Sequence, residues 1–170
     1  MPGTPEPVVG SAVVTLGLAV ATGTLVAVVP LVVGRRPSPR RYAAVGGGVY
    51  ALVVGGLWAV PRIGVAGLGC SLPGDAGTCG PFALIGVLVL AGQGAVALYT
   101  HGEYGYVVPL GATASVTLVL AWSFLRIGGE SDPMTLYALF FGPAAVGVTC
   151  VLGVCEGIVR RRRGTAVTAS

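Results

Sequence analysis

Five long apolar segments without a single charged residue constrain this chain more than any other feature. Each is close to the ~20 residues that an α-helix needs to cross ~30 Å of hydrocarbon. A segment of this length in lipid must be helical, because its backbone N–H and C=O groups find no water there and an open sheet would leave an unpaired edge. The sequence therefore predicts an all-α integral membrane protein, a bundle of five transmembrane helices in one membrane domain. The expected spans are residues 8–33, 42–60, 81–99, 107–125 and 135–155.

The composition excludes most other classes of protein. Only 9% of the 170 residues are charged and 54% are hydrophobic, whereas a soluble domain averages about 25% charged residues. The apolar content is too high for a disordered chain, and four cysteines are too few for a disulfide-dense scaffold. No phosphate-binding loop, Gly-x-Ser-x-Gly or His-Glu-x-x-His motif occurs. These observations favour a protein that is not an enzyme and that needs neither a cofactor nor a metal.

The positions of the arginines predict the orientation of the chain. Cytoplasmic segments next to span ends collect Lys and Arg, and all ten basic residues here are arginines. With the C-terminus inside, segments 34–41, 100–106 and 156–170 hold eight Arg against two Glu, a net charge of +6. The outer segments hold two Arg against four acidic residues, a net charge of −2. We therefore expect a plasma-membrane protein with its N-terminus outside and its C-terminus in the cytoplasm.

Eight arginines are expected at the cytoplasmic face, where they set the topology and contact anionic lipids. They are Arg35, Arg36, Arg40, Arg41, Arg160, Arg161, Arg162 and Arg163. A polybasic segment beside a span gains about 1 kcal/mol per residue at an anionic membrane surface, which explains the basic tail 156–170 without a nucleic-acid partner. The residues before the first span carry Glu6 and no basic residue. The first span is therefore expected to be an uncleaved anchor and not a signal peptide.

Small residues spaced four apart predict how the spans pack, because helices in lipid associate through close approach of their backbones. The first three ridges, in spans one, two and five, are Ser11, Thr15, Ala19, Gly23 and Ala27; Ala43, Gly47, Ala51, Gly55 and Ala59; and Ala145, Thr149, Gly153 and Gly157. The fourth span carries the shorter pair Gly111 and Ser115. We expect these ridges to pack within the chain, with a membrane-protein partner or a second copy as the alternative. Pro143 is expected to free the carbonyl of Leu139 and to kink the last span.

Two of the four cysteines are predicted to form a disulfide. Cys70 and Cys79 fall in the outer loop 61–80, on the oxidising side of the membrane. A bridge there would close a loop of about ten residues and contribute roughly 3 kcal/mol; free thiols and a redox-active or metal-binding pair are the alternatives. Cys150 and Cys155 lie five residues apart in the last span, so a helix directs them to different faces. They are expected to be small buried hydrophobic residues.

Polar side chains within the spans are the candidate site. Gln93 is the strongest of them, and Thr24, Thr113 and Thr149 are expected at nearly the same depth. The four predict either an interhelical hydrogen-bond cluster or the lining of a cavity for a small neutral solute. His101, the only histidine, is expected in a turn that faces the headgroups, with a pH-sensitive gate as the alternative.

Three functions follow from these patterns. The preferred one is a non-enzymatic accessory or assembly subunit of a membrane complex. The second is a small transporter or channel whose path passes Gln93, Thr113 and Thr149, and the third is a membrane thiol-redox protein. The absence of ionisable residues from the spans argues against proton relays, voltage sensors and many ion-coupled transporters. The lack of a Cys-x-x-Cys motif argues against thiol exchange.

Overall fold

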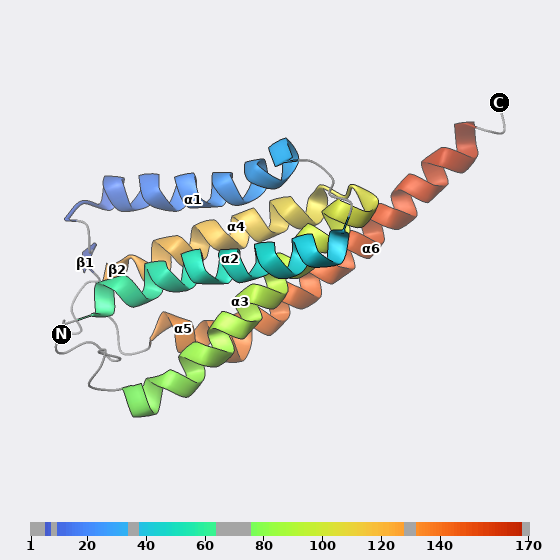
Figure 1. The fold of residues 1–170 in the computed structure, drawn as a ribbon. Coiled ribbons are helices and arrows are strands. Elements are labelled where there is room, and N and C mark those ends of the chain that lie inside the picture. Colours follow the sequence, from blue (N-terminus) through green and yellow to red (C-terminus); the bar gives the residue numbers. More distant parts are fainter. Residues whose placement is uncertain (1–5, 8–9, 34–37, 64–75, 128–131, 168–170) are drawn as a thin grey trace.

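The computed structural model is a bundle of long helices (Figure 1) and describes residues 6–7, 10–33, 38–63, 76–127 and 132–167. Five helices form most of it: α1 (Ala12–Val33), α2 (Pro39–Ala59), α3 (Ala76–Tyr104), α4 (Val108–Phe124) and α6 (Gly142–Val167). The shorter elements are the 3-10 turn η1 (Val60–Arg62), helix α5 (Pro133–Leu136), the π-helical segment η2 (Tyr137–Phe141), and the two-residue strands β1 (Glu6–Pro7) and β2 (Arg126–Ile127).

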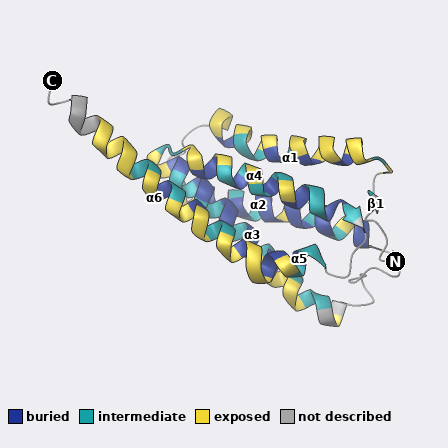
Figure 2. Ribbon diagram, turned by 180° about the vertical axis from the view of Figure 1, so that it is seen from behind, coloured by how far each residue is buried: buried dark blue, intermediate teal, exposed yellow. Residues whose placement is uncertain are grey.

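Four of the helical segments are long and apolar enough to cross a membrane. They are Ala12–Val33, Pro39–Arg62, Cys79–Tyr104 and Pro133–Arg163, and α4 is a shorter apolar helix of 17 residues. Large aliphatic side chains cover the outside of the bundle, and α1 and α6 are exposed over much of their length (Figure 2). A water-soluble monomer rarely exposes an apolar surface of this extent. The prediction of a helical protein with helices long and apolar enough to cross a membrane is thus confirmed, with four such segments and the shorter α4 in the described residues.

The third helix is longer than the sequence predicted. It begins at Ala76 and ends at Tyr104, so that residues 100–104, expected in a loop, continue the helix. It ends at Gly105, which has a positive φ of 69° and donates its backbone N–H to the carbonyl of His101 at 2.8 Å. Glycine adopts this left-handed conformation without steric cost and commonly terminates helices in this way. No residue between Tyr99 and Gly105 stops the helix earlier.

Two of the predicted ridges of small residues pack within the chain. The most extensive helix contacts are those of α2 with α3 and of α1 with α4. A Cβ atom at Gly47 would lie 2.6 Å from the carbonyl oxygen of Ala91, and one at Gly23 would lie 3.0 Å from that of Ala114. The backbones therefore approach each other closely at both contacts, as expected for helices that associate in lipid. By contrast, a Cβ atom at Gly111 would meet nothing within 4 Å.

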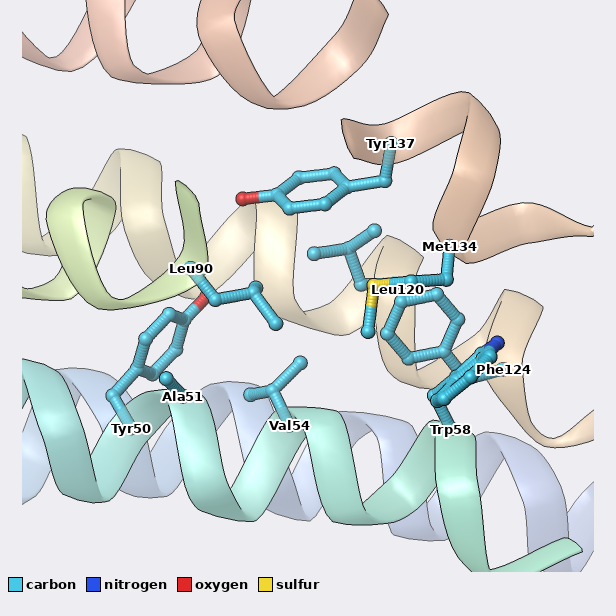
Figure 3. Close-up of a cluster of buried hydrophobic side chains, with 9 residues drawn as sticks. All are labelled: Tyr50, Ala51, Val54, Trp58, Leu90, Leu120, Phe124, Met134 and Tyr137. Carbon is cyan, nitrogen blue, oxygen red and sulfur yellow. The ribbon is translucent and has the colours of Figure 1, made fainter. Parts of the chain in front are cut away.

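The elements α5, η2 and α6 follow one another without a break, and we call Pro133–Arg163 the last helical segment. The core lies where α2, α3, α4 and the start of this segment meet. Its buried side chains are Tyr50, Ala51, Val54, Trp58, Leu90, Leu120, Phe124, Met134 and Tyr137 (Figure 3). Tyr137 comes from η2, where Gly142 donates its N–H to the carbonyl of Tyr137, an i→i−5 bond. Pro143, which lacks an N–H, follows directly. The irregularity predicted at this proline is therefore a π-helical segment on its N-terminal side, a common form for a helix interruption.

The two ends of the bundle differ in charge. Arg40 and Arg41 at the start of α2 lie beside the end of α3, because Gly102 is close to Pro39 and Tyr42. The side chain of Arg160 reaches the same place, and we call this the arginine-rich end. At the opposite end β1 pairs with β2, the carboxylate of Asp132 lies beside Arg62, and Cys79 begins the apolar part of α3. Arg35 and Arg36 lie outside the described residues.

Candidate functional site

Five buried polar side chains from four segments meet inside the bundle, and we call them the polar centre. They are Tyr50 of α2, Gln93 of α3, Thr113 and Thr117 of α4, and Tyr137 of η2. The hydroxyl of Tyr137 donates to the side-chain oxygen of Gln93 at 2.5 Å. The hydroxyl groups of Tyr50 and Thr117 lie 2.9 Å apart. Figure 3 shows both tyrosine hydroxyl groups on the Leu90 side of the core, away from Trp58.

One chain of hydrogen bonds in the polar centre is complete. Thr117 donates its hydroxyl to the carbonyl of Thr113, one turn earlier in α4, at 2.7 Å. Because that bond uses the only hydroxyl proton of Thr117, Tyr50 must donate to Thr117. The hydrogen bond of Tyr50 joins α2 to α4, and that of Tyr137 joins η2 to α3. These contacts tie together helices that are distant in the sequence.

Two polar atoms of the polar centre have no hydrogen-bond partner. They are Nε2 of Gln93, a residue with 0% exposure, and Oγ1 of Thr113, a residue with 1% exposure. A buried polar group that is left unpaired costs about 1–3 kcal/mol, and such groups in native proteins call for an explanation. The polar centre therefore holds unused hydrogen-bonding capacity.

A cavity of about 170 Å³ adjoins the polar centre and is bounded by α1, α2, α3 and α4. Pro30, Tyr50, Gly94 and Thr113 are among the residues that line it. A Cβ atom at Gly94 would lie 2.8 Å from the ring of Tyr50. The ring can therefore pack directly against the backbone of α3 because residue 94 has no side chain. An apolar cavity of about 150 Å³ in a protein interior can hold a molecule the size of benzene. This cavity is large enough for a small solute, and Thr113 supplies it with an unpaired hydroxyl.

The structure brings together only part of the polar set predicted from the sequence. Gln93 and Thr113 lie in the polar centre, but Thr149 donates its hydroxyl to Ala145 of its own helix. Thr24 lies on an exposed face of α1, one residue beyond Gly23, which faces α4. Successive residues of a helix are about 100° apart, so equal depth in the membrane does not imply a shared face.

Sequence reasoning did not identify Tyr50, Thr117 and Tyr137 as members of this site. The two tyrosines lie well inside apolar segments, and a buried tyrosine hydroxyl normally needs a hydrogen-bond partner. That requirement is the signal in the sequence that could have revealed them.

At the end of the bundle opposite to the arginine-rich end, a buried ion pair joins η1, which follows α2, to the N-cap residue of α5. Arg62 lies 3.3 Å from Asp132, and their side chains are 7% and 9% exposed. The indole of Trp58 donates to Asp132 at 2.9 Å, and Arg62 donates to the carbonyl of Trp58 at 2.7 Å. Asp132 also accepts the backbone N–H of Thr135 at 3.0 Å, which caps α5. From the sequence, Arg62 and Asp132 were recognisable only as charges of the predicted outer segments.

At the arginine-rich end, Glu156 of α6 caps the start of α4. Its carboxylate accepts the N–H of Val107 at 3.0 Å and that of Val108 at 2.9 Å, and it pairs with Arg160 one turn later. Arg160 also donates to the carbonyl of Gly105 at 3.0 Å. A carboxylate is favourable at this position because the N-terminus of a helix is positively polarised. These contacts hold the α3–α4 turn against α6.

His101 is buried and lies on the last turn of α3, not in a loop turn as the sequence predicted. It is 7% exposed, and its Nδ1 lies 3.1 Å from the carbonyl oxygen of Tyr106. The carbonyl can only accept, so Nδ1 carries the proton. The histidine is turned inward because α3 continues through residue 104, which places His101 on the last turn of the helix.

The cysteines occupy different parts of the bundle. Cys79 lies near the start of α3, whereas Cys70 lies outside the described residues, so the disulfide between them stays a prediction. Cys150 and Cys155 are free and exposed, which corrects the expectation that they are buried. Both lie on α6, five residues apart.

A groove of about 620 Å³ runs between α4 and the last helical segment, and we call it the α4–α6 groove. Small residues, among them Ala112, Ser115, Ala144 and Ala145, alternate along it with larger ones such as Leu136 and Phe141. The hydroxyl of Ser115 donates to the carbonyl of Gly111 in its own helix at 3.0 Å. The groove therefore presents a nearly apolar surface in which short side chains leave room between larger ones.

Within the residues that the structure describes, no group of three or more His, Cys, Asp or Glu side chains is placed to hold a metal ion. Comparisons of the chain with protein-family models, with curated proteins and with solved structures find no match.

Proposed function

We propose that this chain crosses the plasma membrane five times, with its N-terminus outside and its C-terminus in the cytoplasm. Four long apolar helices support this, together with α4, whose 17 residues extend about 25 Å at 1.5 Å per residue. The arginines of α2 and α6 gather at one end of the bundle, as expected for its cytoplasmic end. The opposite end carries β1 and the Arg62–Asp132 pair.

Within that membrane, the protein acts as a non-enzymatic accessory or assembly subunit, and the α4–α6 groove receives an apolar transmembrane helix of its partner. The groove is the observation that carries this proposal. The ridges at Gly23 and Gly47 already pack against other helices of the chain. The α4–α6 groove is open on one side, and no described helix of this chain covers that opening. Short side chains allow the close backbone approach through which helices associate in lipid.

The chemistry of the groove matches an apolar helix. Besides Tyr137, whose hydroxyl donates to Gln93, its polar side chains are Ser115, Ser123 and Thr149. All three hydroxyl groups are already bonded to carbonyls of their own helices, so they require nothing from an occupant. A partner helix with small or aliphatic residues on one face would satisfy every part of this surface.

Purification from native membranes in mild detergent, followed by native mass spectrometry, tests the proposal. We expect a stoichiometric foreign subunit with the wild-type chain. Ala144→Phe, which fills the groove, should release this subunit, whereas Ala21→Phe, at an exposed position of α1, should not. Recovery of a lone chain or a homo-oligomer from wild-type membranes would refute the accessory role.

A carrier for a small neutral solute is the second candidate. The unpaired Nε2 of Gln93 and Oγ1 of Thr113 favour it, since Thr113 lines the cavity between α1 and α4. A solute that accepts one hydrogen bond and donates another would complete the polar centre. Purified protein in liposomes should then conduct small neutral solutes, and Gln93→Leu should abolish the flux while the protein remains folded.

A thiol-redox function has less support. Cys150 and Val96 line the same cavity, and Cys79 precedes Val96 by about 25 Å of helix at 1.5 Å per residue. Direct exchange requires a thiolate to contact the disulfide sulfur that it attacks. Cys79 and Cys150 are too far apart for that contact.

A further inference from the structure

The arginine-rich end carries another cavity, of about 420 Å³, between α3 and α6. Its apolar part is formed by side chains such as Val96, Val154 and Ile158, and Tyr104, Tyr106 and Arg161 also line it. Cys150 and Arg161 belong to the same wall and are separated by about 16 Å along the helix. The cavity therefore changes from apolar to cationic and aromatic toward the end of the bundle.

The aromatic side chains at this end are held in place. The rings of Tyr104 and Tyr106 stack with their centres 5.2 Å apart, and the guanidinium of Arg160 lies 5.3 Å from the centre of the Tyr106 ring. Gly157 leaves room for the hydroxyl of Tyr106 beside α6. Tyrosines are enriched at the level of the lipid headgroups, so this wall marks the boundary between hydrocarbon and headgroups.

The charge beside the cavity is positive. Glu156 is already bonded to two backbone N–H groups of α4 and to Arg160, so its negative charge is neutralised locally. Glu103 is exposed and does not line the cavity. Arg161 lines it, and Arg162 and Arg163 follow on the same helix. An anion that enters this end meets an excess of guanidinium groups.

We infer that this cavity is a binding site for one anionic phospholipid. The acyl chain lies against Val96 and Val154, and the phosphate lies at Arg161. This lipid site lies between α3 and α6, so it can be occupied whether or not a partner helix fills the α4–α6 groove. A soluble phosphate compound would leave the apolar wall uncovered, and an apolar helix would carry no charge complementary to the arginines. A phospholipid supplies both parts.

Native mass spectrometry of the full chain, delipidated in non-ionic detergent, tests this site. Phosphatidylglycerol and phosphatidylcholine with identical acyl chains are added in parallel. We expect the wild type to retain one phosphatidylglycerol, and Arg161→Gln to weaken this retention about fivefold, since one arginine near an anionic surface contributes on the order of that factor. Arg163→Gln removes the same charge from an exposed position outside the cavity, where solvent and salt screen it from the bound phosphate, and should change retention less than about twofold.

Three results would overturn the inference. Equal losses in the two arginine variants would show that the basic tail attracts lipid without a defined site. Equal retention of phosphatidylcholine would show that the headgroup is not recognised. Displacement of phosphatidylglycerol by millimolar inorganic phosphate would show that the ligand is a soluble anion.

A second measurement leaves the arginines unchanged. Cys150 lines the cavity and Cys155 does not, although both are free and exposed. The variants Cys155→Ala and Cys150→Ala each keep only one of these two thiols, and a hydrophobic maleimide reports the access to the thiol that remains. Phosphatidylglycerol should slow the labelling of Cys150 several-fold and leave that of Cys155 unchanged. Equal effects on both thiols would place the lipid elsewhere and overturn the site.

Discussion

Tyr137 and Gln93 share one hydrogen bond, but we predict that removing Tyr137's hydroxyl destabilises the protein more than replacing Gln93. Both side chains are buried, and Nε2 of Gln93 is already unpaired in the wild type. Tyr137→Phe removes the hydroxyl and leaves the oxygen of Gln93 unpaired as well. Gln93→Leu leaves the hydroxyl of Tyr137 unpaired but removes the unpaired amide. The two single substitutions break the same bond and leave different numbers of unpaired groups.

The magnitudes follow from counting those groups. The wild type contains one unpaired group at this contact, Gln93→Leu contains one, Tyr137→Phe contains two, and the double variant contains none. With about 1–3 kcal/mol for each unpaired group, Tyr137→Phe should lower the free energy of unfolding by about that amount. Gln93→Leu should leave it nearly unchanged, because leucine and glutamine have similar volumes. The double variant should exceed the wild type by about 1–3 kcal/mol.

Titration with a denaturing detergent in mixed micelles, followed by the fluorescence of Trp58 and Trp122, measures these free energies. The double variant should be the most stable protein, and Tyr137→Phe the least stable. The wild type and Gln93→Leu should lie between them, with nearly equal stability. A loss for Gln93→Leu as large as that for Tyr137→Phe would refute the reasoning. It would mean that Nε2 has a partner in the native protein, and a bound solute in the adjoining cavity would then become the favoured explanation.

Three further predictions concern other parts of the bundle. Asp132→Ala should lower the free energy of unfolding by about 3–5 kcal/mol, because it strands a buried arginine; an unchanged detergent midpoint would contradict this. Gly47→Ala should destabilise the protein, because the new methyl group would lie 2.6 Å from a carbonyl oxygen of α3, whereas Gly48→Ala enters open space and should be neutral or stabilising by up to about 1 kcal/mol. If both substitutions have equal effects, the close α2–α3 contact is absent. If Cys70 and Cys79 are bridged outside the cell, a membrane-impermeant thiol reagent should label them only after reduction, and labelling of untreated cells would exclude the disulfide.

The sequence predicted the helices better than their contacts. Apolar segments without charge located α1, α2, α3, α4 and the last helical segment, because an uncharged run of about 20 residues has few alternatives to a helix in lipid. The ends of the helices were less predictable. The α3 helix continues to Tyr104 because nothing stops it before Gly105, and the last segment contains a π-helical stretch before Pro143.

The candidate site was predictable only in part. Gln93 stood out as an amide within an apolar span, and Thr113, which was grouped with it, also lies in the polar centre. The sequence contains no comparable sign that Thr24 is exposed or that Thr117 receives the hydroxyl of Tyr50. Depth depends on position along a helix, whereas contact also depends on rotation about its axis and on which helices are neighbours.

The sequence by itself determined the helical class, the approximate apolar segments and the separation of charge along the chain. These properties depend on residues close in sequence and on the cost of exposing charge or unpaired backbone groups to hydrocarbon. Only the tertiary structure decided that Tyr50, Gln93 and Tyr137 share one polar centre, and that Asp132 joins Arg62. The physical reason is that lipid solvates every apolar face equally well. Neighbours are therefore selected by close packing and by a few hydrogen bonds between distant residues, which no local pattern records.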